Sequence, residues 1–349
     1  METLESEGRM DNSRTKESKR IWQRGLTVGM VAGAGAILLN RSLRIAESQR
    51  WKKKMGPANG RMALVTGASS GIGAVYAQRL AELGYDLTLV ARRENRLNAL
   101  AADLREHCLV RAEALVADLS IEEGIAKLEN RLAQGDVDFL VNNAGYDVLG
   151  FFSRIPAAAT QGVINCHLLA SVRACRAVLP GMIARRRGVI VNVSSTSAFA
   201  PTPGQVTYSA VKAYLNMFSE ALQMEVAGKG IRVQVLCPGF TRTEFHKSPQ
   251  YAAYDLEKNI PAFLWMTPQE VVEASLRGVA EGVVIVIPGM VNKLLSLVMR
   301  SGLPTLLTRL AVNLAGERLD MEKYLPGGEG AQSPAEGRGS RPGEKPAEA

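Results

Sequence analysis

A glycine-rich turn between an apolar run and a helical pattern constrains this chain most. Met62-Ala63-Leu64-Val65 predicts a short buried strand, Thr66–Gly73 follows it, and apolar periodicity from Ala74 to Leu83 predicts a helix. Glycines at 67, 71 and 73 let the backbone turn tightly and approach a ligand, while the helix start offers unpaired N–H groups and a positive dipole. We therefore expect a negatively charged ligand over this turn. Because the spacing is G-x-x-x-G-x-G, a glycine-rich connector without a ligand is the alternative.

Short apolar runs alternate with helical patterns from Met62 onward, which is typical of a parallel sheet covered on both faces. The pattern predicts an α/β fold over 61–289, a single doubly wound (Rossmann) domain with a seven-stranded parallel sheet. Its ligand crevice is expected at the carboxyl ends of the strands. The expected strands are 62–66, 86–91, 112–117, 138–142, 188–193, 231–236 and 283–287, and the expected helices include 94–105, 121–134, 160–185, 206–228 and 268–281.

Composition argues against nucleic-acid binding, a disulfide scaffold and a metal site. Residues 1–60 hold 12 Lys and Arg against 6 Asp and Glu, so they carry +6 of the net charge of +8, and the remainder lacks an aromatic-interleaved basic stripe. The four cysteines show no C-x-x-C pair, which favours a reducing compartment. His107, His167 and His246 are isolated from one another, so we expect surface or packed histidines and no bound metal.

The basic leader, residues 1–60, contains an uncharged apolar segment at 25–39. Fifteen residues fall short of the roughly 20 that span a bilayer as a helix, and glycine at four of them lowers helix propensity. Asn40-Arg41 stand where a signal peptide would need a small-residue cleavage site. Three hypotheses stay open for this segment: an uncleaved membrane anchor, a helix lying in the membrane interface, and a disordered leader.

Beyond the last strand, 290–325 predicts two short amphipathic helices that pack on the sheet or a neighbouring subunit, or else contact a membrane. Their apolar positions are Leu294, Leu295, Val298, Leu303, Leu306, Leu307 and Leu310, interrupted by Gly302 and Pro304. Residues 326–349, rich in Gly, Pro, Ser, Glu and Ala, predict a disordered tail.

Polar motifs follow the second, third and fourth predicted strands. Arg92-Arg93 stand about 20 residues beyond the turn, where an acid would bind the ribose of NAD and a base favours the 2′-phosphate of NADP. We expect NADP(H), with NAD(H) as the alternative. If no ligand binds here, the two arginines are part of a solvated charge run on the next helix. Asp118-Leu119 offers a carboxylate for an adenine amino group, and Asn142-Asn143-Ala144-Gly145 lets the backbone pass close to a ribose.

A fourth motif follows the fifth predicted strand. Tyr208 and Lys212 are four residues apart, so a helix places them on one face, and the ammonium would favour the phenolate. This matters because an unperturbed tyrosine, with a pKa of about 10, transfers protons poorly near neutrality. Ser195, at the end of the fifth strand, could hydrogen-bond a carbonyl oxygen that gains negative charge. Taken alone, Tyr and Lys at this spacing are more often a plain surface pair, so the three residues are weighed as a set.

With these motifs in hand, the chain resembles the short-chain dehydrogenase/reductase family over about 62–245. The matches are Thr66–Gly73 to the cofactor turn, Asn142–Gly145 to N-N-A-G, Tyr208–Lys212 to Y-x-x-x-K, Asn165 to the fourth catalytic position, and Pro238–Thr243 to the P-G-x-x-x-T loop. Together the motifs and the resemblance predict cofactor binding by Gly67, Ser69, Ser70, Gly71, Ile72, Gly73, Arg92, Arg93, Asp118, Leu119, Asn143, Ala144, Gly145, Tyr208, Lys212, Pro238, Gly239, Thr241 and Thr243.

The resemblance implies a role for each catalytic position. Tyr208 would donate a proton to a carbonyl oxygen that Ser195 positions, while hydride comes from NADPH. Lys212 would lower the pKa of Tyr208 and hold the nicotinamide ribose, and Asn165 would hold a water that connects Lys212 to solvent. Members of the family commonly pair through the helices near 160–185 and 206–228, which implies a homo-oligomer, a dimer or tetramer.

We therefore expect an NADP-dependent oxidoreductase acting on a ketone/secondary-alcohol pair, with a catalytic domain in the cytoplasm, membrane-associated if 25–39 inserts. The segment after the Pro238–Thr243 loop carries apolar side chains and is expected to form a lid over an apolar substrate, such as a lipid, 3-oxoacyl or steroid-like molecule. A hydrophobic loop packed on the domain or at a subunit interface explains the same side chains equally well. They are Phe245, Tyr251, Tyr254, Phe263, Leu264 and Trp265. The alternative function is a membrane-tethered NADP-binding scaffold or redox sensor that performs no catalysis.

Overall fold

The computed structural model describes residues 51–247, 251, 256–302 and 306. The chain divides into two units, Met1–Gly56 and Pro57–Ala349, and every element named below belongs to the second. The apolar segment 25–39, most of the second C-terminal amphipathic segment and the tail 326–349 lie outside the described residues. The expectations for those segments therefore stay predictions.

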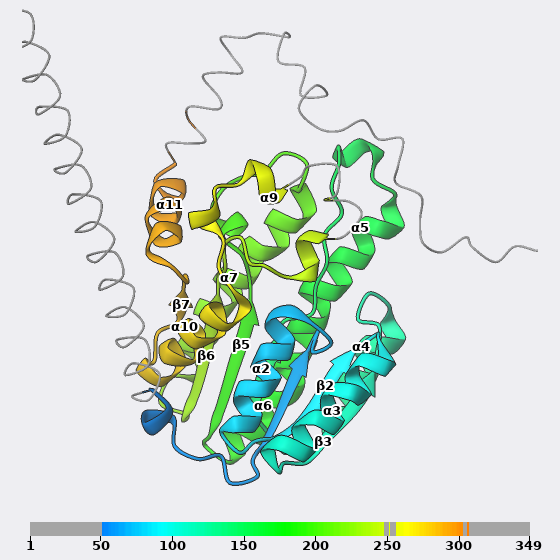
Figure 1. Cartoon of the computed structure of the whole chain (residues 1–349), viewed down its shortest axis with the longest axis vertical. Helices are drawn as coiled ribbons and strands as arrows, with labels where there is room; N and C mark the ends of the chain where they lie inside the picture. The colour runs from blue at the N-terminus through cyan, green and yellow to red at the C-terminus, as the bar shows by residue number, and fades with distance from the viewer. Residues whose placement is uncertain (1–50, 248–250, 252–255, 303–305, 307–349) are drawn as a thin grey trace, which may run out of the picture. The chain divides into compact units, whose positions relative to one another are not determined.

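Seven parallel strands form one sheet in the order β3-β2-β1-β4-β5-β6-β7 (Figure 1). Because the order reverses between β1 and β4, the sheet is doubly wound and the predicted fold class is confirmed. Each predicted strand lies within two residues of its observed bounds. The strands are β1 (Met62–Thr66), β2 (Asp86–Ala91), β3 (Ala112–Val116), β4 (Val137–Asn142), β5 (Gly188–Val193), β6 (Ile231–Leu236) and β7 (Ile285–Val286).

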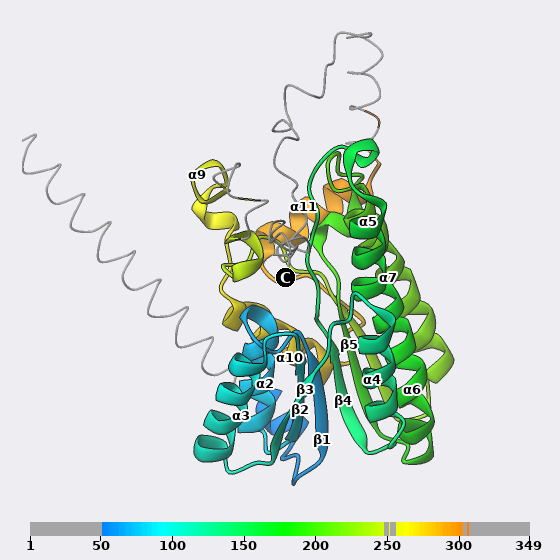
Figure 2. The same cartoon turned by 90° about the vertical axis from the view of Figure 1, so that its right-hand side faces the viewer.

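Helices cover both faces of this sheet (Figure 2). One face carries α2 (Gly71–Glu82), α3 (Glu94–Cys108) and α10 (Pro268–Glu281), and the other carries α4 (Glu122–Leu132), α6 (Ala170–Ala184) and α7 (Val206–Val226). Helix α5 (Ala157–Ile164) continues into α6 through a π-helical turn, Asn165–Leu169. The shorter elements are the 3₁₀ turns Phe152–Arg154, Thr196–Phe199, Glu244–Lys247 and Ala262–Leu264, with helices α9 (Leu256–Asn259) and α11 (Met290–Arg300).

Helix α10 shows how local sequence sets an element's bounds. The Thr267 hydroxyl accepts a hydrogen bond from the Glu270 N–H at 3.2 Å, while the Glu270 carboxylate accepts one from the Thr267 N–H at 3.0 Å. This reciprocal capping box, with Pro268 at the first helical position, fixes the start of the helix. Gly282 ends it with a φ of 76°, a left-handed conformation that glycine adopts without steric cost.

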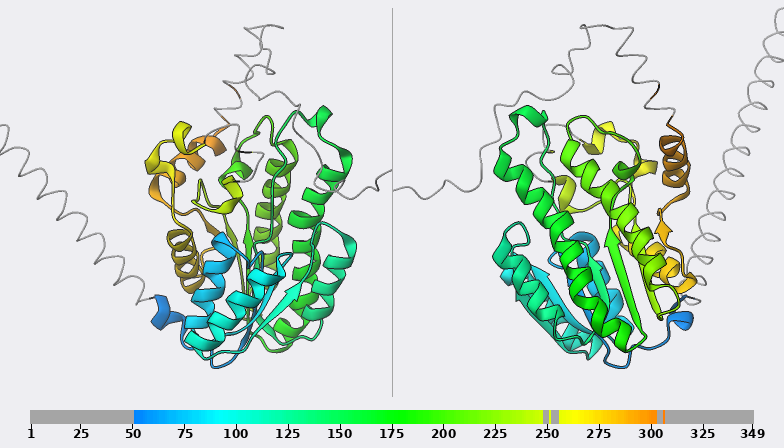
Figure 3. Two further views of the ribbon diagram at one scale, coloured as in Figure 1. Left: turned by 45° about the vertical axis from the view of Figure 1, so that its right-hand side comes forward. Right: turned by 180° about the vertical axis from the view of Figure 1, so that it is seen from behind.

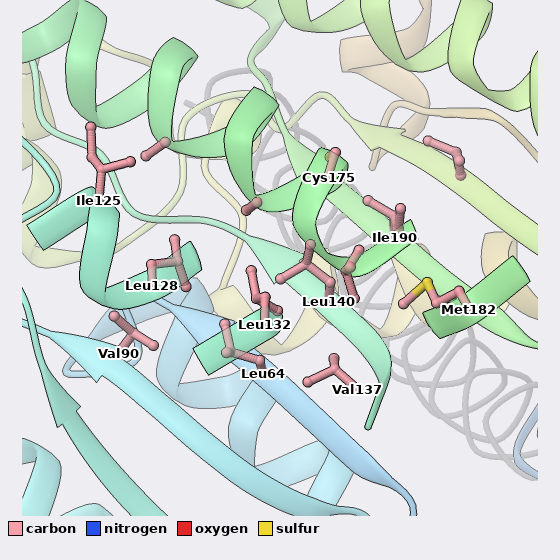
Figure 4. Close-up of a cluster of buried hydrophobic side chains, with 14 of the residues drawn as sticks. Leu64, Val90, Ile125, Leu128, Leu132, Val137, Leu140, Cys175, Met182 and Ile190 are labelled. Atoms are coloured by element: carbon pink, nitrogen blue, oxygen red, sulfur yellow. The ribbon is translucent and has the colours of Figure 1, made fainter. Parts of the chain in front are cut away.

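A buried hydrophobic core lies between the sheet and helices α4, α6 and α7 (Figure 4). Side chains from five adjacent strands meet one stripe each of α4, α6 and α7, so the 3.6-residue period of the helices matches the pleat of the sheet. The members labelled in Figure 4 include Leu64, Val90, Leu140 and Ile190 from the strands, Ile125, Leu128 and Leu132 from α4, and Cys175 and Met182 from α6.

Two helices bear on membrane contact. Within the described residues, Ala157–Ala184 is the one helix long and apolar enough to cross a membrane, and half of its most apolar window is buried in the fold, as in a core helix. Helix α11 has the amphipathic spacing expected after the last strand, but its polar face is buried and its apolar face is exposed. The polar Asn292 and Ser296 are buried, whereas Met290, Leu294 and Leu297 are 70%, 58% and 68% exposed. Among the described residues, nothing covers these apolar side chains.

Replacing Leu128, which is fully buried on α4, with alanine should remove about 3 kcal/mol from the free energy of unfolding, because the vacated volume cannot be refilled by its packed neighbours. Urea unfolding followed by circular dichroism measures this. Met224→Ala is the matched control, since Met224 is 76% exposed on α7, and should change stability by less than about 0.5 kcal/mol. Equal losses in the two variants would contradict the core described above.

Candidate functional site

The glycine turn and the segment after β4 pack against each other at the carboxyl edge of the sheet. The Thr66 hydroxyl accepts hydrogen bonds from the N–H groups of Asn143 and Ala144 at 2.9 and 3.0 Å, and the Asn143 amide donates to the Thr66 carbonyl at 2.9 Å. A Cβ at Gly67, where φ is 68°, would lie 2.7 Å from Asn143 Nδ2. Only glycine allows this approach, so the two motifs build one wall of a site.

Gly73 and Gly71 are equally restricted, and the loop after β6 reaches the same turn. A Cβ at Gly73 would overlap the carbonyl oxygen of Gly67, and one at Gly71 would lie 3.0 Å from the Thr243 side chain. Ile72 between them is half-buried. The structure thus brings Thr243 of the Pro238–Thr243 loop against the turn.

Hydrogen bonds to backbone carbonyl groups hold other residues of that loop. Thr196 N–H donates to the Pro238 carbonyl at 2.9 Å, and the buried Thr241 hydroxyl donates to the Gly239 carbonyl at 3.0 Å. A Cβ at Gly239 would meet the Asn292 amide of α11. The loop is therefore fixed between β5, the glycine turn and α11.

Arg93 places its guanidinium across the start of α2. Its Nη2 donates to Ser69 Oγ at 2.9 Å and to Ser70 Oγ at 2.7 Å, and its Nη1 donates to Glu244 Oε2 at 2.7 Å. Arg96 Nη1 donates to the other oxygen of Glu244 at 2.6 Å. Two guanidinium groups thus hold one anionic group beside the turn, and two hydroxyls hold one of these guanidinium groups; such a guanidinium pair suits a phosphate.

Arg92 and Asp118 face each other at the ends of β2 and β3. Asp118 Oδ1 accepts hydrogen bonds from the Ser120 N–H and hydroxyl at 2.9 and 2.7 Å, and Arg92 Nη1 lies 3.8 Å from Asp118 Oδ2. The Arg92 guanidinium also lies over the Tyr146 ring, 5.7 Å from its centroid. Leu119 is buried with the core beneath them. One oxygen of Asp118 is committed to its own turn, and the other faces Arg92.

Tyr208, Ser195 and Lys212 come together where β5 meets α7. Tyr208 is 9% exposed, and a hydrogen bond joins it to the Ser195 side chain. Lys212 Nζ lies 5.5 Å from the centroid of the Tyr208 ring and donates to the Val193 carbonyl at 2.7 Å. This is the single hydrogen bond of that ammonium within the described part of the chain. Because an ammonium has three donors, two are not used by the described residues.

The pKa shifts in this group differ from the sequence-based expectation. Burial, together with the nearby Asp147 carboxylate, raises the pKa of Tyr208, and the hydrogen bond with Ser195 opposes this only in part. Burial also lowers the pKa of Lys212 to about 8, which weakens the charge that was expected to favour the phenolate. The expected lowering of the Tyr208 pKa was therefore wrong for the protein without ligands, because desolvation dominates the shift.

Asn165 does not join the triad. Its Nδ2 donates to the Ser120 carbonyl at 2.8 Å, and its Oδ1 accepts from Gln161 Nε2 at 2.8 Å, so both amide atoms are engaged away from Tyr208. His167 packs edge-on against the Tyr208 ring instead, with the ring centroids 5.5 Å apart. Both residues belong to the π-helical turn, which shifts the side chains that follow it around the helix.

His167 was expected as a packed or surface histidine, and it is packed and fully buried. Its Nε2 lies 3.0 Å from the Tyr146 N and 2.6 Å from the Tyr146 O, while its Nδ1 has no hydrogen-bond partner within the described part of the chain. Burial holds the His167 pKa well below its usual value, so the ring is neutral. A Cβ at Gly145 would overlap this ring, which explains the glycine at the end of the Asn142–Gly145 motif.

Sequence patterns missed Asp147, which lies beside the triad. Its buried carboxylate accepts hydrogen bonds from Tyr251 Oη at 2.9 Å, Gln205 Nε2 at 2.5 Å and the Val148 N–H at 2.7 Å. Burial raises the pKa of Asp147. The only local signal was an acid two residues beyond Gly145, and nothing in the sequence indicated that Tyr251, 104 positions later, would bind it.

An aromatic cluster forms the side of the site next to Tyr208. Phe245 lies 5.9 Å from the Tyr208 ring and 5.8 Å from Tyr251, and His246 packs on both Tyr251 and Trp265. Of the apolar side chains expected as a lid or packed loop, Tyr251 and Trp265 are buried, whereas Phe263 is 71% exposed and Tyr254 lies outside the described residues. The segment therefore contains both buried and solvent-exposed apolar side chains.

Metal ligands and disulfides do not contribute to the described site. No group of three or more His, Cys, Asp or Glu side chains in the described ranges is placed to hold a metal ion. Cys108, Cys166, Cys175 and Cys237 are all free thiols.

Comparison with known proteins identifies the family. A family model described as "short chain dehydrogenase" matches residues 61–252. The chain belongs to the short chain dehydrogenase family. This family match covers the glycine turn, the Asn142–Gly145 segment and the Tyr208 triad, and ends just after the loop that carries Thr243.

Individual short chain dehydrogenases show what this one is similar to. It is 40% identical over 187 residues to the human "Inactive hydroxysteroid dehydrogenase-like protein 1", which covers 53% of this chain and 57% of that protein. It is 36% identical over 197 residues to the mouse "Very-long-chain 3-oxoacyl-CoA reductase", covering 55% and 63%. The chain thus spans less than two thirds of these relatives.

A solved short chain dehydrogenase gives the same result for the fold. The short-chain dehydrogenase from Sphingobium yanoikuyae in complex with NADPH superposes with a TM-score of 0.62 and 38% identity, covering 70% of this chain and 95% of that one.

Tyr251→Phe should lower the free energy of unfolding by about 2 kcal/mol, because it removes a buried hydrogen bond to the Asp147 carboxylate. Thermal and urea unfolding measure the change. Tyr214→Phe is the matched control: Tyr214 is 46% exposed and stacks on Phe218, and its hydroxyl has no hydrogen-bond partner among the described residues. If Tyr251→Phe is as stable as this control, the Asp147 contact does not hold the segment.

Proposed function

We propose that this protein is an NADP(H)-dependent oxidoreductase that interconverts a ketone and a secondary alcohol. The observation that carries the proposal is the buried group of Tyr208, Ser195 and Lys212 at the same sheet edge as the glycine turn. A phenol, a hydroxyl and an ammonium placed together in a crevice suit proton transfer to a carbonyl oxygen. The mouse relative is named for reduction of a 3-oxoacyl group, which is chemistry of this class.

The residues present fit the dinucleotide. Gly67, Gly71 and Gly73 leave backbone space for a pyrophosphate at the start of α2, and two Lys212 donors remain for ribose hydroxyls. Arg93 with Ser69 and Ser70 offers donors for a 2′-phosphate, which favours NADP(H) over NAD(H). The Sphingobium yanoikuyae structure, which contains NADPH, supports this choice. We assign the remaining cofactor contacts to the positions predicted from the sequence.

The bound nicotinamide would supply hydride, and the chain's own residues would handle the proton. Because burial raises its pKa, Tyr208 keeps its proton at neutral pH and is set to donate it to a carbonyl oxygen. Ser195 would position that oxygen and stabilise its developing charge. Lys212, held on the Val193 carbonyl, would stabilise the phenolate that remains after proton transfer.

We assign to His167 the fourth catalytic position that the family resemblance implied for Asn165. His167 Nδ1 is buried beside the triad with no partner among the residues that the structure describes, and an unpaired buried polar atom of this kind is commonly satisfied by an ordered water. Such a water would connect the interior to solvent in the way expected of Asn165. His167 therefore acts as a positioning group in this proposal.

We propose an apolar substrate and two surfaces for assembly. The aromatic side chains of Phe245, Tyr251 and Trp265 beside Tyr208 suit an apolar ketone.

The exposed apolar side chains of α11, on a helix with Lys293 and Arg300 and no acidic residue, suit a membrane surface. Helices α6 and α7 lie side by side (Figure 3), and a groove of about 520 Å³ between them, lined by Val172, Leu179, Phe218 and Leu222, supports pairing of two chains.

A second candidate function is an NADP-binding scaffold or redox sensor that performs no catalysis. The observation that favours it is the 40% identity to a human protein named as inactive. Catalysis remains the better supported proposal, because Tyr208, Ser195 and Lys212 are all present and assembled.

Tyr208→Phe should lower kcat for ketone reduction at least about 100-fold, because it removes the proton donor while keeping the ring. The dissociation constant for NADPH should change little. Oxidation of NADPH with a panel of apolar ketones and 3-oxoacyl thioesters measures the first, and NADPH fluorescence measures the second. Tyr214→Phe should retain wild-type turnover. Turnover by the wild type that survives in Tyr208→Phe contradicts the assignment, and a cellular role that survives it favours the scaffold.

The pKa of Lys212 sets the pH dependence. Burial lowers this pKa to about 8, so the ammonium is charged below pH 8 and neutral above it, whereas the raised pKa of Tyr208 keeps the phenol protonated throughout. The kcat/KM for reduction, which reports groups of the free enzyme, should therefore fall as pH rises through about 8. Lys212→Arg, slower but permanently charged, should lack this fall. A wild-type profile that stays level to pH 10 contradicts the role of the charge.

A further inference from the structure

Glu244 occupies the centre of the arginine group at the glycine turn. Its two carboxylate oxygens are bound by two different guanidinium groups, Arg93 at 2.7 Å and Arg96 at 2.6 Å. Arg93 is also held by both serine hydroxyls of the turn. Glu244 thus satisfies the donors that would otherwise be free to take an anionic ligand, although it comes from a segment about 150 positions along the chain.

The position of Glu244 connects this group to the Tyr208 side of the site. The preceding residue, Thr243, packs against Gly71 of the turn, and the following residue, Phe245, packs against the Tyr208 ring. These residues belong to or adjoin the 3₁₀ turn Glu244–Lys247. Glu244 therefore lies between one residue that contacts the turn and one that contacts Tyr208.

We propose that Glu244 is an internal competitor for the 2′-phosphate of the dinucleotide, which must displace its carboxylate from Arg93 and Arg96 to bind. The inference rests on the proposed NADP(H) function and deepens it. It assigns to one residue both a part in cofactor selection and a link from the cofactor to the substrate side of the site.

Charge is the physical reason for displacement. Hydrogen bonds from Arg93 and then Arg96 lower the pKa of Glu244 to about 2, so the carboxylate stays ionised in the working pH range. A phosphate monoester carries about −1.5 to −2 near pH 7 and presents three acceptor oxygens, whereas the carboxylate carries −1 and presents two. Two guanidinium groups neutralise the phosphate better, and both anions held between them would repel each other.

The same reasoning separates the two dinucleotides. One without a 2′-phosphate has no group to compete with Glu244, so the Glu244 pairs with Arg93 and Arg96 stay in place. One with the phosphate releases Glu244, and with it the backbone that carries Phe245. Glu244 thus weakens binding of the phosphorylated form and couples its arrival to the packing around Tyr208.

The test compares Glu244→Gln with Glu94→Gln. Glu94 is exposed beside Arg93 at the start of α3, and no ion pair joins it to another described residue, so its replacement removes one nearby negative charge without releasing an arginine. Dissociation constants for NADPH and NADH are measured by fluorescence titration of the full chain. Both variants are checked for an unchanged melting temperature, which two exposed side chains should preserve.

The expected result is that Glu244→Gln binds NADPH about fivefold more tightly than the wild type, the change expected when exposed ion pairs no longer have to be broken. NADH should change by less than about twofold, and Glu94→Gln should shift both cofactors by less than about twofold. Adenosine 2′,5′-bisphosphate, used as a competitor of NADPH, should gain in affinity as NADPH does, whereas 5′-AMP should not. This pair assigns the effect to the 2′-phosphate.

Two results overturn the inference and are distinct from failure of the proposed function. NADPH binding to Glu244→Gln that is equal to or weaker than binding to the wild type means that Glu244 supports Arg93 instead of competing for it. An equal gain in affinity for NADPH and NADH means that the lost negative charge acts on both cofactors alike, and not through the 2′-phosphate. If neither the wild type nor the variant binds NADPH, the proposed function itself fails.

Discussion

The attachment of α7 to the end of β5 is the constraint on which the rest of the site depends. Lys212 Nζ donates to the Val193 carbonyl at 2.7 Å, and the Ser194 hydroxyl donates to the Lys212 carbonyl at 2.9 Å, so helix and strand end are joined in both directions. Deeper in the sheet, Asn192 donates to Ser219 of α7 at 2.9 Å. Because these groups are buried, their hydrogen bonds are costly to break, and they hold α7, which carries Tyr208, against the end of β5.

Desolvation, more than pairwise charge, sets the chemistry of this buried group. An ammonium four residues from a phenol was expected to acidify it, yet burial raises the Tyr208 pKa and lowers the Lys212 pKa. The same burial keeps His167 neutral. At the exposed mouth of the crevice the balance reverses, and the arginines hold the Glu244 carboxylate ionised. The site therefore combines an interior that disfavours charge with an entrance that attracts anions.

The sequence predicted the fold and most of the positions around the site, because those signals are local. Apolar runs gave the seven strands to within two residues, and the glycines at 67, 71 and 73 marked the turn that the structure shows to be closed to any larger residue. It failed where long-range packing decides. The π-helical turn moved Asn165 onto Ser120 and brought His167 to Tyr208, and no motif indicated that Asp147 would hold Tyr251.

The sequence by itself therefore determined the order of strands and helices, the ligand turn and the presence of Tyr208, Ser195 and Lys212, since periodicity and spacing act within a few residues of chain. Only the tertiary structure decided which side chains face that tyrosine, which way their pKa values shift, and which face of α11 is left outward. Burial is a property of the assembled chain. Its effect on a charge or a hydrogen bond depends on neighbours that the local sequence does not contain.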